Sequence, residues 1–597
     1  MGLIFKRGIG LIPSPSWIKP CLVMLIIVTA GCVYLAMDLV PIYMREVRLN
    51  WNLEKMSNLG FPINESRGFS EDYLNTSASH STALDRPLPD TRDKLCRTFS
   101  QRMGVSFQSV SIIMPFYNEV WSMLIRSLYS ILKRTPSHLL KEIILVDDFS
   151  SRDYLKRPLD NFAKDFPKIK IIRQKSRGGL MVARMTGARA ATGGVLVFLD
   201  AHIECLDYWL VPLLDSLTRM PTSIAVPTAD DIDPKTIKYR TWSSTVHGGF
   251  DWKLEYVWKF LPEHETKRRT SSIDPIRSPT LIGFAFAVSR SYFFSFGGFD
   301  EGMRIWGGEN LEISFRAWMC GEGVYIIPCS RIAHVFRSYL PYSFPDKHGK
   351  ENGGNIIQKN LQRAAEVWMG EYRPHFYAAI GKYVPLSKEE NKTLQQRIQL
   401  KQTLKCKDFK WYLNKVIPEM IIPANQSIYF GQLKNFGTGA CMTFVPDKDK
   451  MQMQDCQVYA NQLFSLTKTG NLILNEKCLT VYQRPNDTTP YVKVTQCITT
   501  TQGIPKNQTW VFNTTVPNTM PIDNRSKGLI GRFMQQFSNN IIGCMCHITD
   551  HDKAQVVDFE PCKKFQTSYK YQYWVFSHKM NYAIWNERNK NHQSGFE

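Results

Sequence analysis

Short apolar runs alternate with amphipathic stretches between residues 109 and 199. The apolar runs, which are rich in Val, Ile and Leu, predict strands at 109–116, 142–146, 168–173 and 195–199. Between them, apolar positions recur at helical spacing in 121–134 and 181–191. Strands that alternate with helices in this way predict βαβ units and a doubly wound, Rossmann-like, mostly parallel α/β sheet.

The pattern changes after about residue 425, where strand-like segments alternate with turns and no long helix is indicated. Three related tripeptides recur in this part of the chain: Gln462-Leu463-Phe464, Gln508-Thr509-Trp510 and Gln572-Tyr573-Trp574. A single match to the pattern Gln-x-Trp is weak evidence. Three matches in order, with cysteines between them, predict an all-β trefoil built from a threefold repeat.

A third pattern lies near the start of the chain, where residues 21–37 are all apolar or small. This length is near the lower limit for a membrane-spanning helix and exceeds most signal-peptide cores. Basic residues precede the segment, which favours a cytoplasmic N-terminus and a lumenal body. A cleaved signal peptide is the alternative. The expected divisions are a cytoplasmic tail at 1–20, a transmembrane signal anchor at 21–40 and a polar stem at 41–85.

Composition indicates the cellular compartment of the protein and limits the classes of partner that it can have. With 597 residues, the chain is long enough for about two or three domains. The net charge of +21 could indicate an acidic partner, but Lys and Arg are spread along the chain without a basic arm or zinc-finger spacing. We therefore interpret the charge as solvated surface and expect no nucleic-acid partner. Eight N-glycosylation sequons and 14 cysteines agree with an oxidising, lumenal location.

The segment Asp200-Ala201-His202 directly follows the strand predicted at 195–199. Residues two apart on extended backbone point the same way, so the carboxylate and the imidazole emerge together at the carboxyl end of the strand. Ligands bind at this end of an open α/β sheet. One carboxylate and one imidazole suit Mn²⁺ or a similar divalent ion, which in turn suits a diphosphate. The alternative is an N-cap aspartate beside a hydrogen-bonded histidine.

Further candidate ligand-binding residues lie in three other segments. Asp148 follows the second predicted strand and could accept hydrogen bonds from a nucleotide, and Arg177 could pair with a phosphate. The segment from Trp306 through two glycines to Glu309 offers a flat face for a sugar and an acceptor for its hydroxyls. Each has an ordinary alternative, namely a cap, a surface residue or a turn that leads into a helix.

From about Leu88 onward, the chain resembles one enzyme family. The segments that carry the resemblance are LPDTR, EIILVDDFS, FLDAH, GGFDW, WGGENLEISFR and HVFR, in this order. They are similar to motifs of the polypeptide N-acetylgalactosaminyltransferases of mucin-type O-glycosylation (glycosyltransferase family 27). The resemblance implies a GT-A catalytic domain at 86–415 and a ricin-type β-trefoil lectin domain at 425–585. It also implies a single-pass type II protein of the Golgi membrane, with a lumenal catalytic domain.

The resemblance implies an activity and its residues. The activity is Mn²⁺-dependent, retaining transfer of GalNAc from UDP-GalNAc to Ser or Thr of a protein acceptor. The implied metal ligands are Asp200, His202 and His334. The implied substrate-binding residues are Asp148, Arg177, Gly283, Trp306, Arg337 and Tyr342, and Glu309, Arg337 and Trp306 are the implied catalytic residues. The expected disulfides are Cys96–Cys329, Cys320–Cys406, Cys441–Cys456, Cys478–Cys497 and Cys544–Cys562, with Cys546 as an alternative to Cys544.

Several positions depart from the usual pattern of this family. Tyr117 and Leu340 stand where histidines are common, Phe284 replaces a glycine, and Gly178 replaces a glutamate. These departures leave open a second interpretation: a weak or inactive transferase-like binding protein of the Golgi, or a transferase with an altered donor sugar. Retention of all three metal ligands favours the enzyme.

The trefoil departs from its family as well. Lectins of this type usually bind sugar through an Asp two residues after the first cysteine of each repeat. The corresponding residues here are Thr443, Thr480 and Cys546. A hydroxyl is a weaker acceptor than a carboxylate for paired sugar hydroxyls. We therefore expect weak or absent GalNAc binding by the trefoil, which would serve structure or peptide positioning instead.

Overall fold

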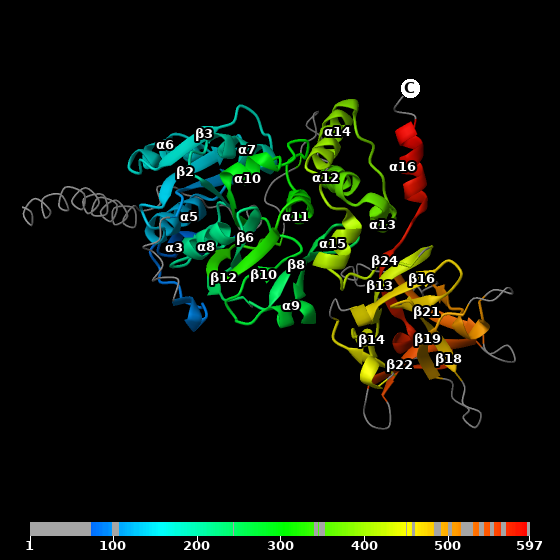
Figure 1. Ribbon diagram of the computed structural model, residues 1–597. Helices are drawn as coiled ribbons and strands as arrows, with labels where there is room; N and C mark the ends of the chain where they lie inside the picture. Colours follow the sequence, from blue (N-terminus) through cyan, green and yellow to red (C-terminus); the bar gives the residue numbers. More distant parts are fainter. Residues whose placement is uncertain are drawn as a thin grey trace, which may run out of the picture.

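The computed structural model describes two folded parts, an α/β part and an all-β part (Figure 1). The described residues are 73–97, 107–338, 344 and 353–593, with gaps at 243, 425, 449, 457–459, 483–490, 499–503, 515–528, 537–541, 550–554 and 563–568. The predicted tail at 1–20, the anchor at 21–40 and most of the stem at 41–85 lie outside these residues. Across the described part of the chain, we find no helix with the length and apolar character needed to cross a bilayer.

Ten strands between residues 110 and 334 form the sheet of the α/β part. Its main order is β10-β12-β6-β11-β4-β1-β2-β3, with β5 beside β12 and β7 beside β6. All four strands predicted from the sequence are present. The bounds are β1 (Val110–Phe116), β2 (Leu140–Asp147), β3 (Ile169–Arg173), β4 (Val195–Leu199), β5 (Ile203–Cys205), β6 (Ser223–Ile232), β7 (Tyr239–Arg240), β10 (Ile276–Arg277), β11 (Ala285–Ser289) and β12 (Gly323–His334).

The prediction of a mostly parallel sheet is wrong, because the sheet is mixed. Strands β1, β2, β3 and β4 pair in parallel, as do β6 and β12, but the five other pairings are antiparallel. After β6 the chain forms β7, the separate hairpin of β8 (Val246–Phe250) and β9 (Tyr256–Phe260), and β10, which pairs near the start of β12. Strand β11 starts at the carboxyl edge of the sheet, with Ala285 opposite Leu199 at the end of β4, and runs back between β4 and β6.

Helices cover both faces of this sheet. Alternate strand residues point to opposite faces, so Ile112 and Val197 join one apolar core while their neighbours Ile113 and Phe198 join the other. The first core is closed by α5 (Trp121–Arg134), α6 (Arg157–Lys164) and α8 (Leu210–Arg219), and the second by α7 (Leu180–Ala190), α10 (Arg290–Ser295), α11 (Glu309–Cys320) and α12 (Gly353–Trp368). The remaining helices of this part are α3 (Thr76–Ser81), α9 (Glu263–Arg268), α13 (Arg373–Ile380), α14 (Lys388–Thr403) and α15 (Phe409–Val416).

The all-β part contains the threefold repeat that the sequence predicts. Phe464, Trp510 and Trp574, which end the three tripeptides, are buried in a single core. The indole Nε1 of Trp510 donates to the Leu479 carbonyl and that of Trp574 to the Met545 carbonyl. Its strands are β13 (Ser427–Asn435), β14 (Cys441–Val445), β15 (Lys450–Gln454), β16 (Leu463–Thr467), β17 (Leu472–Leu474), β18 (Lys477–Tyr482), β19 (Tyr491–Gln496), β20 (Val511–Asn513), β21 (Leu529–Gln536), β22 (Ile542–Thr549), β23 (Gln555–Pro561) and β24 (Trp574–Lys579).

All five predicted disulfides form. They are Cys96–Cys329, Cys320–Cys406, Cys441–Cys456, Cys478–Cys497 and Cys544–Cys562. Cys544, not the alternative Cys546, is therefore the partner of Cys562.

A helix that the sequence did not predict follows the trefoil. This helix, α16 (Ala583–Gln593), lies beside α13 of the α/β part (Figure 1). The Arg588 guanidinium donates twice to the buried Glu366 carboxylate, at 2.6 and 2.8 Å. The Trp585 ring packs 5.7 Å from the Tyr377 ring, and the backbone N–H of Asn581 donates to the Ala378 carbonyl. The end of the chain thus binds the trefoil back onto the α/β part.

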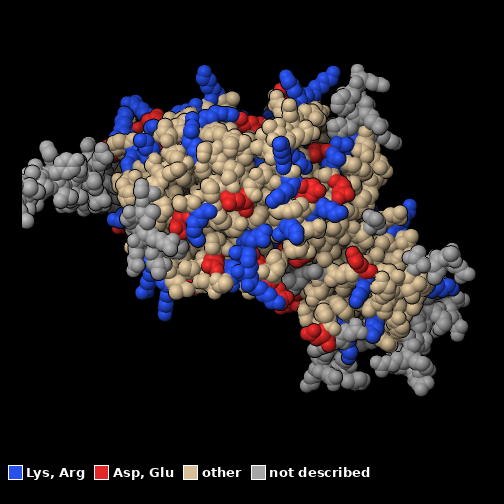
Figure 2. Space-filling model, viewed as in Figure 1, with Lys and Arg blue, Asp and Glu red and all other residues tan. Residues whose placement is uncertain are grey.

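Basic and acidic side chains are interspersed on the face of the molecule shown in Figure 2. Many of the described basic residues are paired, for example Arg189 with Glu301 and Arg219 with Asp215. This distribution agrees with the interpretation of the net charge as solvated surface.

Candidate active site

Three predicted metal ligands meet at the carboxyl edge of the mixed sheet. Asp200 follows β4, His202 precedes β5, and His334 ends β12. Strand pairing brings them together, because His334 lies opposite Ile203 of β5 and the Val335 N–H donates to the His202 carbonyl. One potential ligand atom from each residue lies within 4.8 Å of the others, and His334 Nε2 is 3.4 Å from Asp200 Oδ2. The predicted proximity of His334 to the other two ligands is therefore confirmed.

The state of His334 fits a divalent cation. Its imidazole is buried, and neither ring nitrogen has a hydrogen-bond partner within the described structure. Burial lowers the pKa of His334 to about 4, so the ring is neutral at physiological pH and has a lone pair to offer. Burial alone would raise the pKa of Asp200, but His334 and Arg184 lower it below the ordinary value. A carboxylate with two imidazole nitrogens suits Mn²⁺ and related ions.

Glu119 completes the surroundings of this cluster, and sequence reasoning gave it no role. Its carboxylate is buried in the loop between β1 and α5. Oxygen Oε2 lies 2.8 Å from His202 Nδ1, and Oε1 accepts a 2.6 Å hydrogen bond from Arg337 Nη2. Burial opposes ionisation, but Arg337 and His202 hold the pKa of Glu119 well below its ordinary range. The frequent pairing of a metal-bound histidine with a carboxylate is the signal that could have found it.

Arg184 is a second functional candidate that the sequence did not reveal. It lies on α7, where an arginine is expected on the solvent side, yet its side chain is 1% exposed. Its Nη2 donates to Asp200 Oδ1 at 3.2 Å and to the Gly283 carbonyl at 2.5 Å, and Nη1 lies 3.7 Å from Glu309 Oε1. Arg184 therefore brings two predicted site residues, Gly283 and Glu309, beside the metal ligand.

Gly283 and Glu309 are fixed by backbone geometry as well. Gly283 has φ +94°, a conformation that side-chain-bearing residues rarely adopt, and a Cβ there would lie 3.9 Å from Glu309 Oε1. Glu309 starts α11 and accepts a 3.0 Å hydrogen bond from the Gly307 N–H through Oε2. Burial raises the pKa of Glu309, with Arg184 acting in the opposite direction.

Asp148 contacts backbone in this structure. Its two carboxylate oxygens accept hydrogen bonds from the N–H groups of Gly178 and Gly179, at 2.7 and 2.9 Å. Gly179 in turn pairs with Ile305, which immediately precedes Trp306, and a Cβ on Gly179 would lie 2.4 Å from Ile305 backbone atoms. Asp148 thereby links the loops that follow β2 and β3 to the Trp306 segment.

The outer residues of the predicted site lie on these loops. The Trp306 side chain is 36% exposed, and the Arg177 guanidinium stacks 3.9 Å from the centroid of the Tyr117 ring. Tyr117, which departs from the family pattern, thus supports the predicted phosphate-binding arginine. Tyr342 and Leu340 lie outside the described residues.

Phe284, which departs from the family pattern, has its side chain in the interior of the protein. The Phe284 side chain is 3% exposed, its ring packs at a tilt 4.7 Å from the His334 ring, and Phe336 contacts it edge to face. Its backbone carbonyl accepts the Asp200 N–H at 2.9 Å. Phe284 therefore packs against a metal ligand inside the protein.

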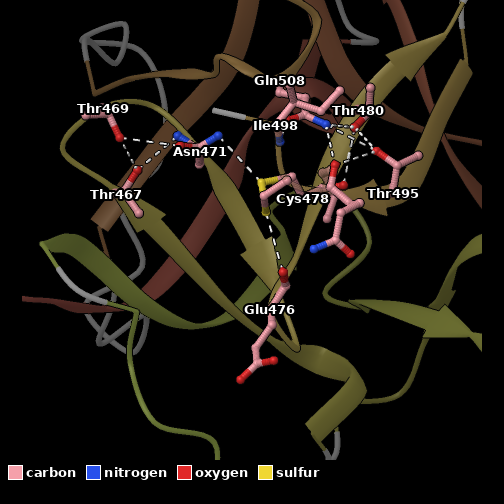
Figure 3. Close-up of a disulfide and its surroundings, with 12 residues drawn as sticks. Thr467, Thr469, Asn471, Glu476, Cys478, Thr480, Thr495, Ile498 and Gln508 are labelled. Carbon is pink, nitrogen blue, oxygen red and sulfur yellow. Dashed lines mark hydrogen bonds between the residues drawn. A yellow bond between two sulfur atoms is a disulfide. The ribbon is translucent and has the colours of Figure 1, made fainter. Parts of the chain in front are cut away.

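The three trefoil residues at the lectin positions are also inside the protein. Thr443, Thr480 and Cys546 are at most 2% exposed. In the second repeat, Gln508 Nε2 donates to Thr480 Oγ1 at 3.0 Å and to Thr495 Oγ1 at 3.2 Å, beside the Cys478–Cys497 disulfide (Figure 3). Gln462 Nε2 donates to Thr443 Oγ1 at 2.8 Å in the first repeat. These hydroxyls are therefore satisfied within the protein.

The mixed sheet, the ligand triad at its carboxyl edge and the attached trefoil define a GT-A glycosyltransferase with a lectin domain. The family model for Glycosyl transferase family 2 matches residues 111–293, the N-terminal domain of galactosyltransferase matches 270–339, and the ricin-type beta-trefoil lectin domain matches 429–528. The chain belongs to the polypeptide N-acetylgalactosaminyltransferase family.

Several curated relatives carry this assignment. The chain is 40% identical to polypeptide N-acetylgalactosaminyltransferase 4 of Mus musculus, over 74% of the chain and 75% of that protein. It is 39% identical to polypeptide N-acetylgalactosaminyltransferase 5 of Caenorhabditis elegans and to putative polypeptide N-acetylgalactosaminyltransferase 9 of Drosophila melanogaster, over 69% of the chain in each case. These two matches span just under two thirds of the relatives' own length, 66% and 63%.

One solved structure covers both folded parts. The crystal structure of GalNAc-T7 with UDP, GalNAc and Mn²⁺ is similar with a TM-score of 0.57 and 28% sequence identity, over 88% of this chain and 93% of that one.

Proposed function

We propose that the protein transfers GalNAc from UDP-GalNAc to Ser or Thr hydroxyls of a polypeptide, with Mn²⁺ as cofactor. The observation that carries this proposal is the cluster of Asp200, His202 and His334, in which a neutral imidazole is buried without a hydrogen-bond partner. The relatives named above and the Mn²⁺, UDP and GalNAc in the GalNAc-T7 crystal structure support it.

The chain's own groups have separate tasks in this reaction. Asp200, His202 and His334 would hold the cation, which supplies Lewis-acid neutralisation of the diphosphate. Arg337 and the Trp306 indole are donors for phosphate oxygens as charge develops on the leaving group. Glu309, beside Gly283, is an acceptor for sugar hydroxyls.

We also propose that the transfer retains the anomeric configuration of the sugar. Each carboxylate described above is already engaged: Asp200 and Glu309 by Arg184, Glu119 by His202 and Arg337, and Asp148 by the N–H groups of Gly178 and Gly179. None is free to act as a covalent nucleophile. We therefore favour attack of the acceptor hydroxyl from the leaving-group side, with a diphosphate oxygen accepting its proton.

Half-buried aromatic side chains next to the triad suit a polypeptide acceptor. They are Trp242, Tyr256 and Trp258, from β9 and the loop before β8, and they line a small pocket together with Ile282. The Trp242 ring lies 5.1 Å from that of Trp258 and 5.5 Å from that of Phe336, which contacts His334. Aromatic walls give contact area to peptide side chains at low entropic cost.

The test uses the full-length protein in detergent, UDP-GalNAc, Mn²⁺ and a mixed pool of Ser- and Thr-containing peptides. We expect UDP release that requires peptide and Mn²⁺, α-linked GalNAc on the peptide by NMR, and no release by His334→Ala. Parallel reactions with UDP-GlcNAc, UDP-galactose and UDP-glucose examine an altered donor. Binding of Mn²⁺ and UDP without turnover of any sugar nucleotide would instead support a transferase-like binding protein.

We also propose that the protein resides in the Golgi membrane as a single-pass type II protein. The apolar segment at 21–37, the basic residues before it and the five disulfides support this location. Protease protection of a C-terminal epitope in sealed Golgi vesicles is expected, and its digestion without detergent would contradict this topology.

A further inference from the structure

Glu119 joins two segments that meet at the proposed active site. Its carboxylate contacts His202, from the segment between β4 and β5, and Arg337, just after β12. The Val120 N–H also donates to Oε1, at 3.0 Å, and the Tyr154 hydroxyl donates to the Glu119 backbone carbonyl. With these contacts and a 7% exposed side chain, Glu119 has little freedom to reorient.

The contact with His202 selects the nitrogen that can bind a cation. An ionised carboxylate can only accept, so His202 Nδ1 must carry the proton in the 2.8 Å contact with Glu119. The lone pair then lies on Nε2, which leaves this nitrogen as the metal ligand. Glu119 thus sets both the tautomer and the direction of the ring.

Glu119 also orients the Arg337 guanidinium, which lies close in sequence to the metal ligand His334. Arg337 is three residues beyond this ligand, and its side chain is 9% exposed. Its Nη2 is held at 2.6 Å by Glu119 Oε1, while its buried Nε has no hydrogen-bond partner in the described structure. The same carboxylate therefore sets the position of a guanidinium and of a metal ligand.

We propose that Glu119 is a positioning residue that couples the divalent-cation site to Arg337, so that the cation and the guanidinium meet a diphosphate as one preorganised unit. This inference rests on the proposed function. A carboxylate that supports a metal-bound histidine contributes about 10–100-fold to metal affinity. Glu119 should contribute this factor to Mn²⁺ binding without nucleotide, and a further factor to UDP binding through Arg337.

Mn²⁺ binding by the full-length protein, measured by electron paramagnetic resonance without nucleotide, separates these roles. Glu119→Gln keeps the shape of the side chain and should weaken Mn²⁺ binding by about 10–100-fold. The matched control is Glu142→Gln, because Glu142 is equally buried but pairs with Ser111, Thr192 and Lys170. This control should bind Mn²⁺ like the wild type.

A second comparison avoids leaving a buried guanidinium unpaired. In the Arg337→Met background, adding Glu119→Gln should still weaken Mn²⁺ binding by about 10–100-fold. Arg337→Met should lower UDP affinity when it is introduced into the wild-type protein. The same substitution should have a smaller effect in the Glu119→Gln protein, because the two groups act together.

The outcomes are distinct. Unchanged Mn²⁺ affinity in folded Glu119→Gln, or in the double variant relative to Arg337→Met, overturns the role of Glu119 and leaves the proposed function intact. Fully additive effects of the two substitutions on UDP binding overturn the coupling. A wild-type protein that binds no Mn²⁺ overturns the proposed metal site together with this inference.

Discussion

His334 in the α/β part and Thr480 in the trefoil are both buried, and the family resemblance implies a ligand-binding role at each position. Both ring nitrogens of His334 are buried without a hydrogen-bond partner in the described structure. The Thr480 hydroxyl, by contrast, contacts Gln508, Thr495 and the Cys478 carbonyl. A buried polar atom without a partner costs free energy, so it persists where a ligand can satisfy it. In the α/β part, potential ligand atoms are thus available, whereas in the trefoil the Thr480 hydroxyl is used in a hydrogen-bond network of the protein itself.

Removing a metal ligand should produce the largest effect. Since supporting residues alone contribute about 10–100-fold to metal affinity, Asp200→Ala should abolish Mn²⁺-dependent UDP binding measured by calorimetry. Asp207→Ala is the control, because Asp207 lies nearby in the chain but its side chain is 70% exposed and pairs with Arg134. Undiminished UDP binding by Asp200→Ala would show that Asp200 is not a metal ligand and would contradict the ligand-binding role given to the α/β part.

In the trefoil, breaking a satisfied network should affect stability instead of ligand binding. Gln508→Leu removes donors to Thr480 and Thr495 and the acceptor for the Ile498 N–H. Leaving buried polar groups unsatisfied should lower the free energy of unfolding by about 1–3 kcal/mol. Denaturation monitored by tryptophan fluorescence measures this loss, with the exposed Gln454→Leu as control. Equal stability of the two variants would show that the network is dispensable.

Sugar recognition by the trefoil should be close to undetectable. Rates of transfer to a peptide and to the same peptide carrying a distant GalNAc should agree within about twofold, a difference of less than 0.5 kcal/mol. The reason is that Thr443, Thr480 and Cys546 are buried and are not carboxylates. A strong preference for the glycopeptide that free GalNAc abolishes would contradict this expectation and restore a lectin function.

The smallest expected effect concerns pH at the junction of the two parts. Burial lowers the pKa of His375 to about 4, below the ordinary 6.5, and its Nδ1 lies 2.8 Å from the Tyr582 hydroxyl that precedes α16. The undocked state therefore binds the proton more readily. Docking of α16 should be strongest above pH 6.5 and weaken as the pH falls towards 4.

Hydrogen exchange of the α16 amides at pH 7 and pH 5, corrected for intrinsic rates, measures this effect. His375→Gln should remove the part of the pH dependence that His375 causes. Equal pH dependence in the wild type and the variant would exclude a role for His375.

The sequence predicts local features well and distant contacts poorly. Strand β4 and the shared direction of Asp200 and His202 follow from an apolar run and the two-residue period of a strand. His334 was identified through the family resemblance alone. Glu119 was missed because its side-chain partners His202 and Arg337 lie 83 and 218 residues away. Arg184 was missed because an arginine on a helix is ordinarily a surface residue, and its contact with Gly283 spans 99 residues.

The mixed sheet was missed for a related reason. The alternation of strands and helices up to β4 is local, but the direction of β11 depends on where the chain returns after more than 50 residues without a covering helix of ordinary length. That return also places Gly283 beside Asp200. The trefoil repeat and its disulfides were predictable because each unit carries its own tripeptide and cysteines.

The contacts of α16 have a mechanical consequence for the trefoil. On the entry side, the Trp252 indole N–H donates to the Ile421 carbonyl at 2.9 Å, and on the exit side Asn581 and Arg588 contact α13 and α12. A body tethered at both its entrance and its exit cannot swivel about a single hinge. The trefoil is therefore held at a fixed distance from the metal triad. An acceptor peptide that contacts both must be long enough to span this distance.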